Sequence, residues 1–386
     1  MGKHTVIIGG GGIGSSTAYF LSTMRAPGDT ITVVERDPTY QSASSSLSAS
    51  SIRQQFSTAL NVKLSQFGYE FMRSCSDDGR PGSSVGLTTS GYLFLGREDQ
   101  RATLSDRTQR ARALGAPIEE VSLDQLAARY PWLKGDDLAY ASIGTDGEGW
   151  FDGYMLQQLY RTRARIGGVR YVQGDVTGFE TKGNRIVAVR LRDGTSIAAD
   201  QFVNAGGAWS AAVAEHVGVS LPVRARRRSI FVVSCPGALP GFPVLIDTSG
   251  IFVRPEQHHF ICAFSPRAED DHDDLPLDPD FPLFEDYIWP TLAERIPSFE
   301  ALRVERAWSG YYEFNTVDHN GLVGRAGPEN FFVATGFSGH GLMHSAGVGR
   351  GMAELLTHGE YRSLDLSPLS PERLVTGQLI VEDAVY

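Results

Sequence analysis

The chain has 386 residues, of which 41% are hydrophobic and 21% are charged, a composition with enough apolar material for a core. A single core usually stops growing below this length, so two domains are expected. The formal net charge is −10, which argues against general nucleic-acid binding and against docking on anionic lipid. No apolar run is long enough to predict a membrane-spanning helix.

The basic residues are almost all arginine. Four lysines stand against 31 arginines, and none follows Lys182, which excludes mechanisms that need a lysine from the second half of the chain. The three cysteines are too few and too widely spaced to predict a disulfide framework or a zinc site, and no metal site is predicted. The N-terminus runs directly into an apolar strand without a secretory signal, so a cytoplasmic location is expected.

The chain begins with a predicted βαβ unit. Residues 4–8 and 31–34 are apolar and rich in β-branched side chains, which is typical of buried strands. Residues 12–24, between them, are predicted to form a helix. This arrangement starts a doubly wound parallel sheet.

The turn between the first strand and the helix carries a dinucleotide-binding fingerprint. Residues 9–14 read Gly-Gly-Gly-Gly-Ile-Gly and fit the pattern G-x-G-x-x-G. Gly9 permits the tight turn, Gly11 allows the backbone to approach a pyrophosphate, and Gly14 allows the helix to pack closely on the strand.

The start of this helix and the end of the second strand would hold the nucleotide. The helix begins at Gly12 and Ile13, and its positive end favours a pyrophosphate. Glu35 ends the second strand, where a carboxylate accepts hydrogen bonds from ribose hydroxyls and repels a 2′-phosphate. The fingerprint alone does not separate NAD from FAD.

Residues 42–51 contain seven serines in ten positions. Such a composition occurs in flexible linkers, but this stretch lies too close to the first unit to be a domain boundary. Further strands and helices are predicted downstream, in chain order at 92–95, 98–114, 152–165, 169–172, 186–191, 196–198, 201–204 and from 209 onward. The strands at 186–191 and 196–198 are expected to form a hairpin.

Two charged segments follow. Residues 224–228 contain four arginines, and a strand would place Arg224, Arg226 and Arg228 on one face. Solvation of an edge strand is the favoured interpretation, and contact with phosphate or substrate is the alternative. Residues 269–280 hold seven acids but lack the ligand spacing and turn glycine of a calcium loop, which favours a solvated surface loop.

The far end of the chain contains a second glycine-rich strand-to-helix turn. A predicted strand at 331–334 leads into residues 335–341, and a helix follows from about Leu342. A dinucleotide held at both ends of the chain suits a long, enclosed FAD. The N-terminus of this helix would stabilise the anion that develops on a reduced flavin.

Four segments spread over nearly the whole chain resemble the D-amino-acid-oxidase-like family of FAD-dependent oxidoreductases, which includes sarcosine oxidase, glycine oxidase and dimethylglycine dehydrogenase. They are residues 6–14 with 35–36, 203–209, 250–255 and 334–341. Residues 308–316 are most similar to the branch of FAD-dependent oxidoreductase domain-containing proteins.

The resemblance implies an α/β and α+β fold of two interleaved domains. The Rossmann-like FAD-binding domain would comprise residues 1–85, 150–222 and 305–386. The substrate domain, built on an antiparallel sheet, would comprise residues 86–149 and 223–304.

The fingerprint and the resemblance together imply a set of residues in contact with FAD. They are Gly9, Gly11, Gly12, Ile13, Gly14, Glu35, Arg36, Ser44, Ser48, Val176, Gly206, Gly207, Trp209, Gly336, Gly339, His340, Gly341, Leu342 and Met343. Val176 would contact adenine through its backbone. The hydroxyls of the serine-rich segment, with nearby N–H groups, would make an anion cradle beside Arg53.

The resemblance also implies what is missing from the site. Sarcosine-oxidase-like relatives hold FAD through a cysteine whose position here is Tyr311, so non-covalent FAD is expected, with Tyr311 and Tyr312 as flavin neighbours or else as core aromatics. Such relatives also have two active-site lysines. One position falls near Phe260 or Ile261, and the other is Met343, which favours a dehydrogenase that uses an electron acceptor other than oxygen, of unknown identity.

The predicted reaction is oxidation of the C–N bond of an amino acid or N-alkyl amino acid by hydride transfer to flavin N5, followed by hydrolysis of the imine. The expected partner is a small, carboxylate-bearing amine. Arg53, at the family's substrate-arginine position, and Arg254 are candidates for binding the carboxylate. Tyr311 and His340 complete the catalytic candidates, although His340 could instead make a structural hydrogen bond.

Two other functions remain open. One is oxidation of a 2-hydroxy acid on the same scaffold, with His340 as the base for the hydroxyl proton. The other is a flavoprotein that has lost turnover and serves as an assembly or redox partner.

Overall fold

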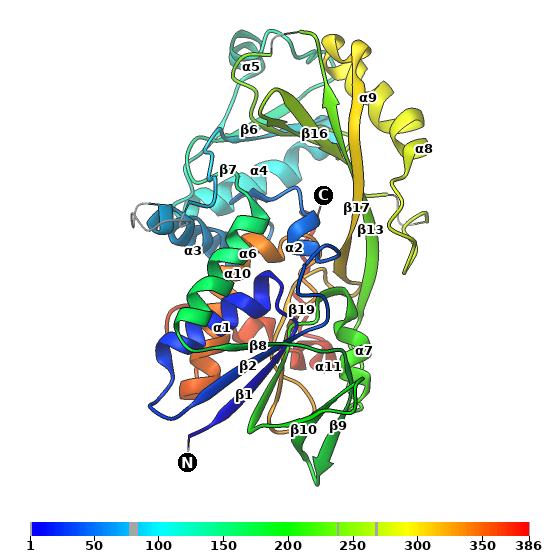
Figure 1. The fold of residues 1–386 in the computed structure, drawn as a ribbon. Helices are drawn as coiled ribbons and strands as arrows, with labels where there is room; N and C mark the ends of the chain where they lie inside the picture. The colour runs from blue at the N-terminus through cyan, green and yellow to red at the C-terminus, as the bar shows by residue number, and fades with distance from the viewer. Residues whose placement is uncertain (1, 77–83, 238, 267–268, 386) are drawn as a thin grey trace.

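The computed structural model describes residues 2–76, 84–237, 239–266 and 269–385. A six-stranded sheet forms the lower part of the molecule in Figure 1, in the order β18-β19-β12-β1-β2-β8. Its strands are β1 (His4–Ile8), β2 (Thr30–Glu35), β8 (Arg170–Gln173), β12 (Gln201–Asn204), β18 (Leu322–Arg325) and β19 (Phe331–Thr335). Neighbouring strands are parallel except β18, which runs antiparallel to β19.

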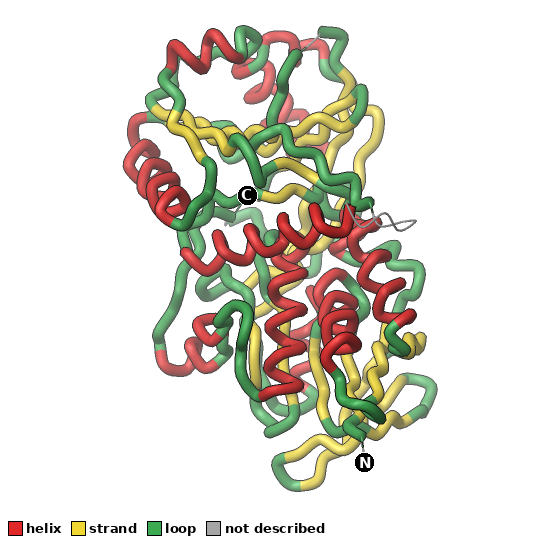
Figure 2. Tube along the Cα trace, turned by 90° about the vertical axis from the view of Figure 1, so that its left-hand side faces the viewer, coloured by secondary structure: helices red, strands yellow, loops and turns green. Residues whose placement is uncertain are grey.

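Both faces of this sheet are covered, which explains why its strands are continuous apolar runs. One face packs against a layer of helices that is visible in Figure 2, where α1 contacts α6 and α10, and α10 contacts α3. These helices are α1 (Gly12–Met24), α3 (Ala59–Ser76), α6 (Gly153–Ile166) and α10 (Gly341–His358). The other face packs against α7 (Ser210–Glu215) and a small sheet of β9 (Val176–Lys182), β10 (Arg185–Leu191) and β11 (Ser196–Ala198).

An eight-stranded sheet forms the upper part of the molecule, in the order β17-β13-β16-β15-β14-β4-β6-β5. Its strands are β4 (Tyr92–Gly96), β5 (Ile118–Glu120), β6 (Tyr140–Gly144), β13 (Val223–Ser234), β14 (Val244–Ile246), β15 (Phe252–Glu256), β16 (His259–Ala263) and β17 (Arg303–Asn315). The pairing is antiparallel except between β14 and β4. The predicted mixture of a mainly parallel and a mainly antiparallel sheet is therefore confirmed.

Helices and turns cover one face of the upper sheet, and the remaining elements lie elsewhere in the two parts. Phe284, Leu292 and Phe299 pack on strand residues in one apolar cluster. The covering elements are α8 (Phe281–Leu283), a π-helical turn (Phe284–Ile288), α9 (Trp289–Arg295) and a 3-10 turn (Pro297–Ala301). The others are α2 (Ser44–Leu47), β3 (Ser51–Ile52), α4 (Glu98–Ala113), α5 (Leu123–Arg129), β7 (Gly149–Trp150), the 3-10 turns Gly207–Trp209 and Ser367–Leu369, and α11 (Glu372–Thr376).

The predicted domain boundary at residue 305 falls inside β17, a strand of the upper sheet. β13 and β17 pair along their whole length and run from the top of the molecule down to the level of α7 (Figure 1). The division into an FAD-binding and a substrate domain at the stated residues stays a prediction.

The arginine-rich stretch lies in β13, and the expectation of a solvated edge was wrong. Its free side is covered by the acidic segment 269–280, with a bridge between Arg226 and Asp273 and a backbone hydrogen bond of 2.9 Å from Asp274 to Ala225. Covering an exposed edge in this way protects it from pairing with other chains. The acidic segment is largely exposed, as expected of a surface loop, and three of its acids (Asp271, Asp273 and Asp280) pair with arginines of β13.

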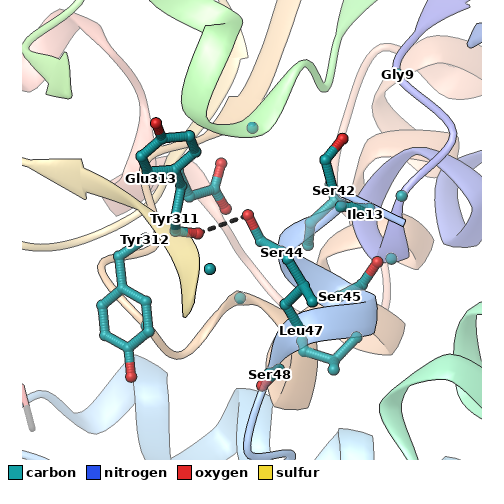
Figure 3. Close-up of a pocket in the computed structure, with 18 of the residues that line it drawn as sticks. Gly9, Ile13, Ser42, Ser44, Ser45, Leu47, Ser48, Tyr311, Tyr312 and Glu313 are labelled. Atoms are coloured by element: carbon teal, nitrogen blue, oxygen red, sulfur yellow. Dashed lines mark hydrogen bonds between the residues drawn. The ribbon is translucent and has the colours of Figure 1, made fainter. Parts of the chain in front are cut away.

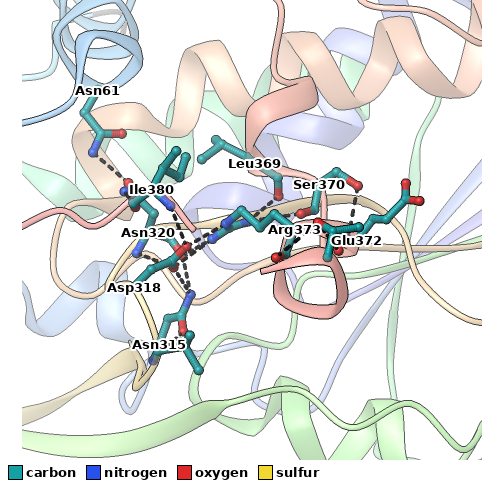
Figure 4. A network of polar contacts seen from close by, with 11 residues as sticks. Asn61, Asn315, Asp318, Asn320, Leu369, Ser370, Glu372, Arg373 and Ile380 are labelled. Atoms are coloured by element: carbon teal, nitrogen blue, oxygen red, sulfur yellow. Dashed lines mark hydrogen bonds and ion pairs between the residues drawn. The ribbon is translucent and has the colours of Figure 1, made fainter. Parts of the chain in front are cut away.

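The C-terminal segment is fastened to the turn after β17 by a buried polar network, shown in Figure 4. Arg373 donates to both oxygens of Asp318, at 2.7 and 2.9 Å, and Asp318 has no exposed surface. Asn320 links the network to Asn61 of α3 and to the backbone of Ile380. This anchoring brings the last described residues back toward the middle of the molecule.

No helix in the described parts of the chain has the length and apolar character required to cross a bilayer.

Candidate FAD and substrate site

A large cavity lies where the two sheets meet. Its empty space is about 2030 Å³, which includes space open to solvent. Figure 3 shows that its wall combines the first glycine turn, the serine-rich segment and the end of β17. The turn before α10 completes it.

The first glycine turn is built as its motif requires. Gly9 has a φ of 92°, and a Cβ there would lie 2.4 Å from the carbonyl oxygen of Ala205. A Cβ on Gly14 would lie 1.9 Å from the carbonyl oxygen of Gly9. At Gly11 the nearest atom to such a Cβ is Ser45 Oγ at 3.7 Å. Side chains therefore have no room at Gly9 or Gly14, whereas Gly11 keeps open backbone beside the start of α1.

Glu35 binds the turn itself. Its carboxylate accepts from the backbone N–H of Gly10 at 2.7 Å and of Asp37 at 2.8 Å. Burial raises the pKa of this carboxyl. Because Glu35 also lines the cavity, the remaining lone pairs of its oxygens are the ones available to ribose hydroxyls.

An aromatic and cationic group lies beside Glu35. The guanidinium of Arg36 stacks 4.3 Å from the ring centre of Trp209, and Trp209 meets Tyr311 edge to face at 6.0 Å. Val176, Gly206 and Gly207 line the same cavity. Apolar faces and exposed backbone of this kind suit an adenosine group.

The serine-rich segment fits a pyrophosphate through a residue that the sequence had not singled out. The hydroxyl of Ser45 is buried and has no hydrogen-bond partner among the described residues. By contrast, Ser44 Oγ donates to the carbonyl of Tyr311 at 2.6 Å (Figure 3), and Ser48 Oγ accepts from the N–H of Ser50 at 3.0 Å. A buried donor without a partner, beside a helix N-terminus, is satisfied by an anion.

The second glycine turn meets the first. A Cβ on Gly12 would lie 2.8 Å from Leu342 Cδ1, and one on Gly339 would lie 2.3 Å from the ring of Tyr312. The residues Gly339, His340, Gly341, Leu342 and Met343 all line the cavity. Of the predicted FAD contacts, Gly14 and Gly336 do not line it.

Glu313 was missed by the sequence reasoning, although it lies in the stretch that resembles the relatives. Its carboxylate accepts from Thr335 Oγ1 at 2.8 Å and from the N–H of Gly336 at 3.1 Å, beside the start of α10. Burial raises the pKa of this carboxyl to about 7. The cavity therefore contains a carboxyl group that changes charge near neutral pH.

His340 is the most unusual polar side chain of the site. It is 2% exposed, and neither ring nitrogen has a hydrogen-bond partner among the described residues. Burial lowers the pKa of the imidazole to about 3, and the carboxylate of Glu382 only partly opposes this shift. The ring lies between Phe56 and His344, at centroid distances of 5.6 and 5.0 Å. His340 is therefore neutral at physiological pH.

Arg53 is held in place at the cavity wall. Its guanidinium donates to the carbonyl oxygen of Gln55 at 2.6 Å and to that of Ala384, and it stacks on Phe56 at 3.9 Å. Arg53 lines the cavity together with Val385 from the C-terminal segment.

Arg254 and Tyr311 lie differently from the expectation. Arg254 does not line the cavity, although Phe252 on the same strand does. It donates to the carbonyl oxygen of Ala49 at 2.9 Å and pairs with Glu256, so its guanidinium is bound to groups of the protein. Tyr311 lines the cavity, but its hydroxyl donates to the carbonyl of Leu275 at 2.7 Å.

Comparison with known proteins identifies the family. Residues 4–355 match the family described as FAD dependent oxidoreductase. The chain belongs to this family. The FAD-dependent oxidoreductase domain-containing protein 1 of Xenopus laevis is 37% identical to this flavoprotein over 417 residues, which cover 98% of this chain and 83% of that protein.

More distant relatives of this FAD-dependent oxidoreductase include named enzymes. The mitochondrial dimethylglycine dehydrogenase of Rattus norvegicus is 26% identical, and the match covers 96% of this chain and 44% of that protein. The crystal structure of L-proline dehydrogenase from P. horikoshii superposes with a TM-score of 0.85 at 24% identity, covering 98% of this chain and 99% of that one. The predicted family, fold class and FAD cofactor are therefore confirmed.

Proposed function

We propose that this flavoprotein oxidises the C–N bond of an amino acid or N-alkyl amino acid that carries a free carboxylate. The observation that carries the proposal is the combination, in one cavity wall, of a fixed guanidinium (Arg53) and a buried neutral imidazole (His340). Bound FAD supplies the hydride acceptor. The chain supplies the charge, orientation and exclusion of water.

The site favours an amine in its neutral form, which hydride transfer requires because the nitrogen lone pair must form the imine. The positive charge of Arg53 and the apolar walls both disfavour an ammonium group. His340 offers a neutral ring nitrogen as a hydrogen-bond partner for the substrate N–H. Water then hydrolyses the imine to a carbonyl compound and an amine.

We further propose that FAD is bound without a covalent link and that the enzyme is a dehydrogenase, which passes electrons to an acceptor other than oxygen. None of the three cysteines and none of the four lysines lines the cavity. Met343, at the family's lysine position, supplies no charge to hold a carboxylate or to assist oxygen. The polar groups of Arg254 and Tyr311 are bound to other parts of the chain. We therefore assign Arg254 a structural role and Tyr311 a role as part of the cavity wall.

A second candidate is oxidation of a 2-hydroxy acid, because one ring nitrogen of His340, which has no partner among the described residues, could accept the hydroxyl proton. The lowered pKa of His340 makes it a weak base, and this favours the amine.

The test is anaerobic mixing of the FAD-loaded protein with L-proline, sarcosine, N,N-dimethylglycine, glycine and lactate. We expect at least one N-substituted amino acid to bleach the flavin, its methyl ester to react far more slowly, and air to restore the colour slowly. Bleaching by lactate alone would favour the hydroxy acid. No bleaching by any compound, with a co-purifying protein, would favour an assembly or redox partner without turnover.

A further inference from the structure

A second arginine lines the cavity, and its surroundings differ from those of Arg53. Arg228 lies on β13 opposite Gly310 of β17, and only 5% of its surface is exposed. Its guanidinium lies 5.1 Å from the ring centre of Tyr312. Figure 3 shows the rings of Tyr311 and Tyr312 pointing in opposite directions from the strand.

Tyr312 lies in the positive field of both cavity arginines. Burial raises the pKa of its hydroxyl, and the charges of Arg228 and Arg53 both oppose that shift. The two guanidinium groups therefore act on the same part of the cavity.

What distinguishes Arg228 is the group that it binds. Its two amino nitrogens donate to the two carboxylate oxygens of Asp271, at 2.6 and 3.0 Å. This two-pronged geometry is the one in which a guanidinium recognises any carboxylate. Arg228 makes one further hydrogen bond, to the carbonyl oxygen of Arg227 at 2.8 Å. Arg53, in contrast, donates to the backbone carbonyls of Gln55 and Ala384, and no side-chain carboxylate among the described residues is bound to it that a substrate could replace.

Asp271 belongs to the acidic segment 269–280, which is fastened by polar contacts. Arg226 pairs with Asp273 at 2.9 Å, and Tyr311 donates to the carbonyl of Leu275. No residue of the segment belongs to an apolar core cluster. Segments held in this way open at lower cost than packed elements.

A displaced Asp271 has space beside it. A second cavity lies under the acidic segment, and Asp271 lines it together with Leu275 and Asp280. Phe264 lines both cavities, so the two are neighbours.

We propose that Arg228 binds the carboxylate of the substrate. In the absence of substrate, the carboxylate of Asp271 occupies the Arg228 guanidinium, and the substrate carboxylate replaces it on binding. The inference rests on the proposed function and names the residue that recognises its substrate class. A buried guanidinium is strongly disfavoured without a partner, so exchange of one carboxylate for another is the favoured route. Arg53 then supplies a fixed charge, and Arg228 supplies the exchangeable contact.

The experiment measures carboxylate binding without turnover. Pyrrole-2-carboxylate is a planar counterpart of proline, and pyrrole-2-carboxamide is its uncharged match. Each is titrated into the FAD-loaded protein, and the change in the visible flavin spectrum gives the Kd. We expect the carboxylate to bind more tightly than the amide.

Two variants of the pair and one matched control decide the result. Arg228→Met is expected to weaken carboxylate binding by about tenfold or more, the effect of losing a charge-assisted contact, and to abolish the preference over the amide. Asp271→Asn removes the competing charge and is expected to tighten carboxylate binding severalfold. Arg306→Met is the control, because Arg306 is an exposed arginine on the neighbouring strand β17 that lines neither cavity, and it should leave carboxylate binding unchanged.

The outcomes separate this inference from the proposed function. Unchanged carboxylate affinity in Arg228→Met, or unchanged or weaker affinity in Asp271→Asn, would overturn the inference. Should Arg228→Met fail to retain FAD, the conservative Asp271→Asn variant still decides. Failure of every amine to reduce the flavin, with the predicted binding shifts present, would refute the proposed function while supporting Arg228 as a carboxylate site.

Discussion

The pH dependence of stability tests the environment of His340 directly. In an unfolded chain a histidine titrates near pH 6.5, whereas burial lowers the pKa of His340 in the folded protein to about 3. As the pH falls below 6.5, the unfolded state binds a proton that the folded state does not. The contribution of neutral His340 to stability is therefore complete above about pH 6.5 and is lost progressively as the pH falls toward 3.

The magnitude follows from the width of this window. Each pH unit within it changes the free energy of unfolding by about 1.36 kcal/mol. Between pH 6.5 and pH 5, His340 should therefore remove about 2 kcal/mol of stability. His340→Gln keeps a polar side chain that does not titrate, so it should lose about 2 kcal/mol less than the wild type over the same range.

The assay is urea unfolding of FAD-loaded protein at several pH values, followed by tryptophan and flavin fluorescence. The control is His358→Gln, because His358 is an exposed histidine at the last position of the same helix, α10. This control should follow the wild-type pH dependence. Equal slopes for the wild type and His340→Gln between pH 6.5 and pH 5 would refute a buried, neutral His340.

Three further outcomes are expected. Arg373→Met leaves the buried carboxylate of Asp318 without its ion pair, and should lower the free energy of unfolding in urea by about 3–5 kcal/mol. The double variant Arg373→Met with Asp318→Asn, which removes the buried charge, should recover part of this loss. Gly14→Ala places a Cβ 1.9 Å from the carbonyl oxygen of Gly9, so the purified variant should carry much less FAD than the wild type by absorbance. Because the pKa of Glu313 is about 7, the carboxyl gains its charge as pH rises through that value. Glu313→Gln should therefore remove a titration near pH 7 from the pH profile of flavin reduction.

Short-range patterns explain what the sequence could predict. The predicted helix at 12–24 is α1 at the same residues, because the glycine turn sets its start. The strand at 201–204 is β12 for a similar reason, since polar and glycine residues bound an apolar run. Strand β9 was missed, because its polar alternate positions resemble a loop, although it pairs with β10 to extend the predicted hairpin to three strands.

The site residues that the sequence missed depend on contacts between distant segments. Glu382 accepts from the N–H of Ser57, 325 positions away, at 2.9 Å. No local pattern predicts that this carboxylate would face His340. Ser45 could not be ranked above the other serines, because only the fold places in the cavity wall a hydroxyl that has no partner among the described residues.

The same reasoning explains why the two cavity arginines could not be assigned from sequence. Arg53 stands at the position that the resemblance favours, yet the fold commits its guanidinium to backbone carbonyls. Arg228 lies in a run of arginines whose composition favours solvation, yet the fold buries it and gives it a carboxylate partner.

The two ends of the chain meet at the cofactor, which has a consequence for stability. Gly12 and Leu342 are in contact range across the two glycine turns, so the FAD site exists only when the first and last parts of the parallel sheet are assembled. A ligand that binds the folded state alone raises stability in proportion to the logarithm of its concentration over its Kd. Tight FAD binding and the assembly of this sheet are therefore coupled. A side chain introduced at Gly9 or Gly14 would weaken both FAD binding and the stability of the folded protein.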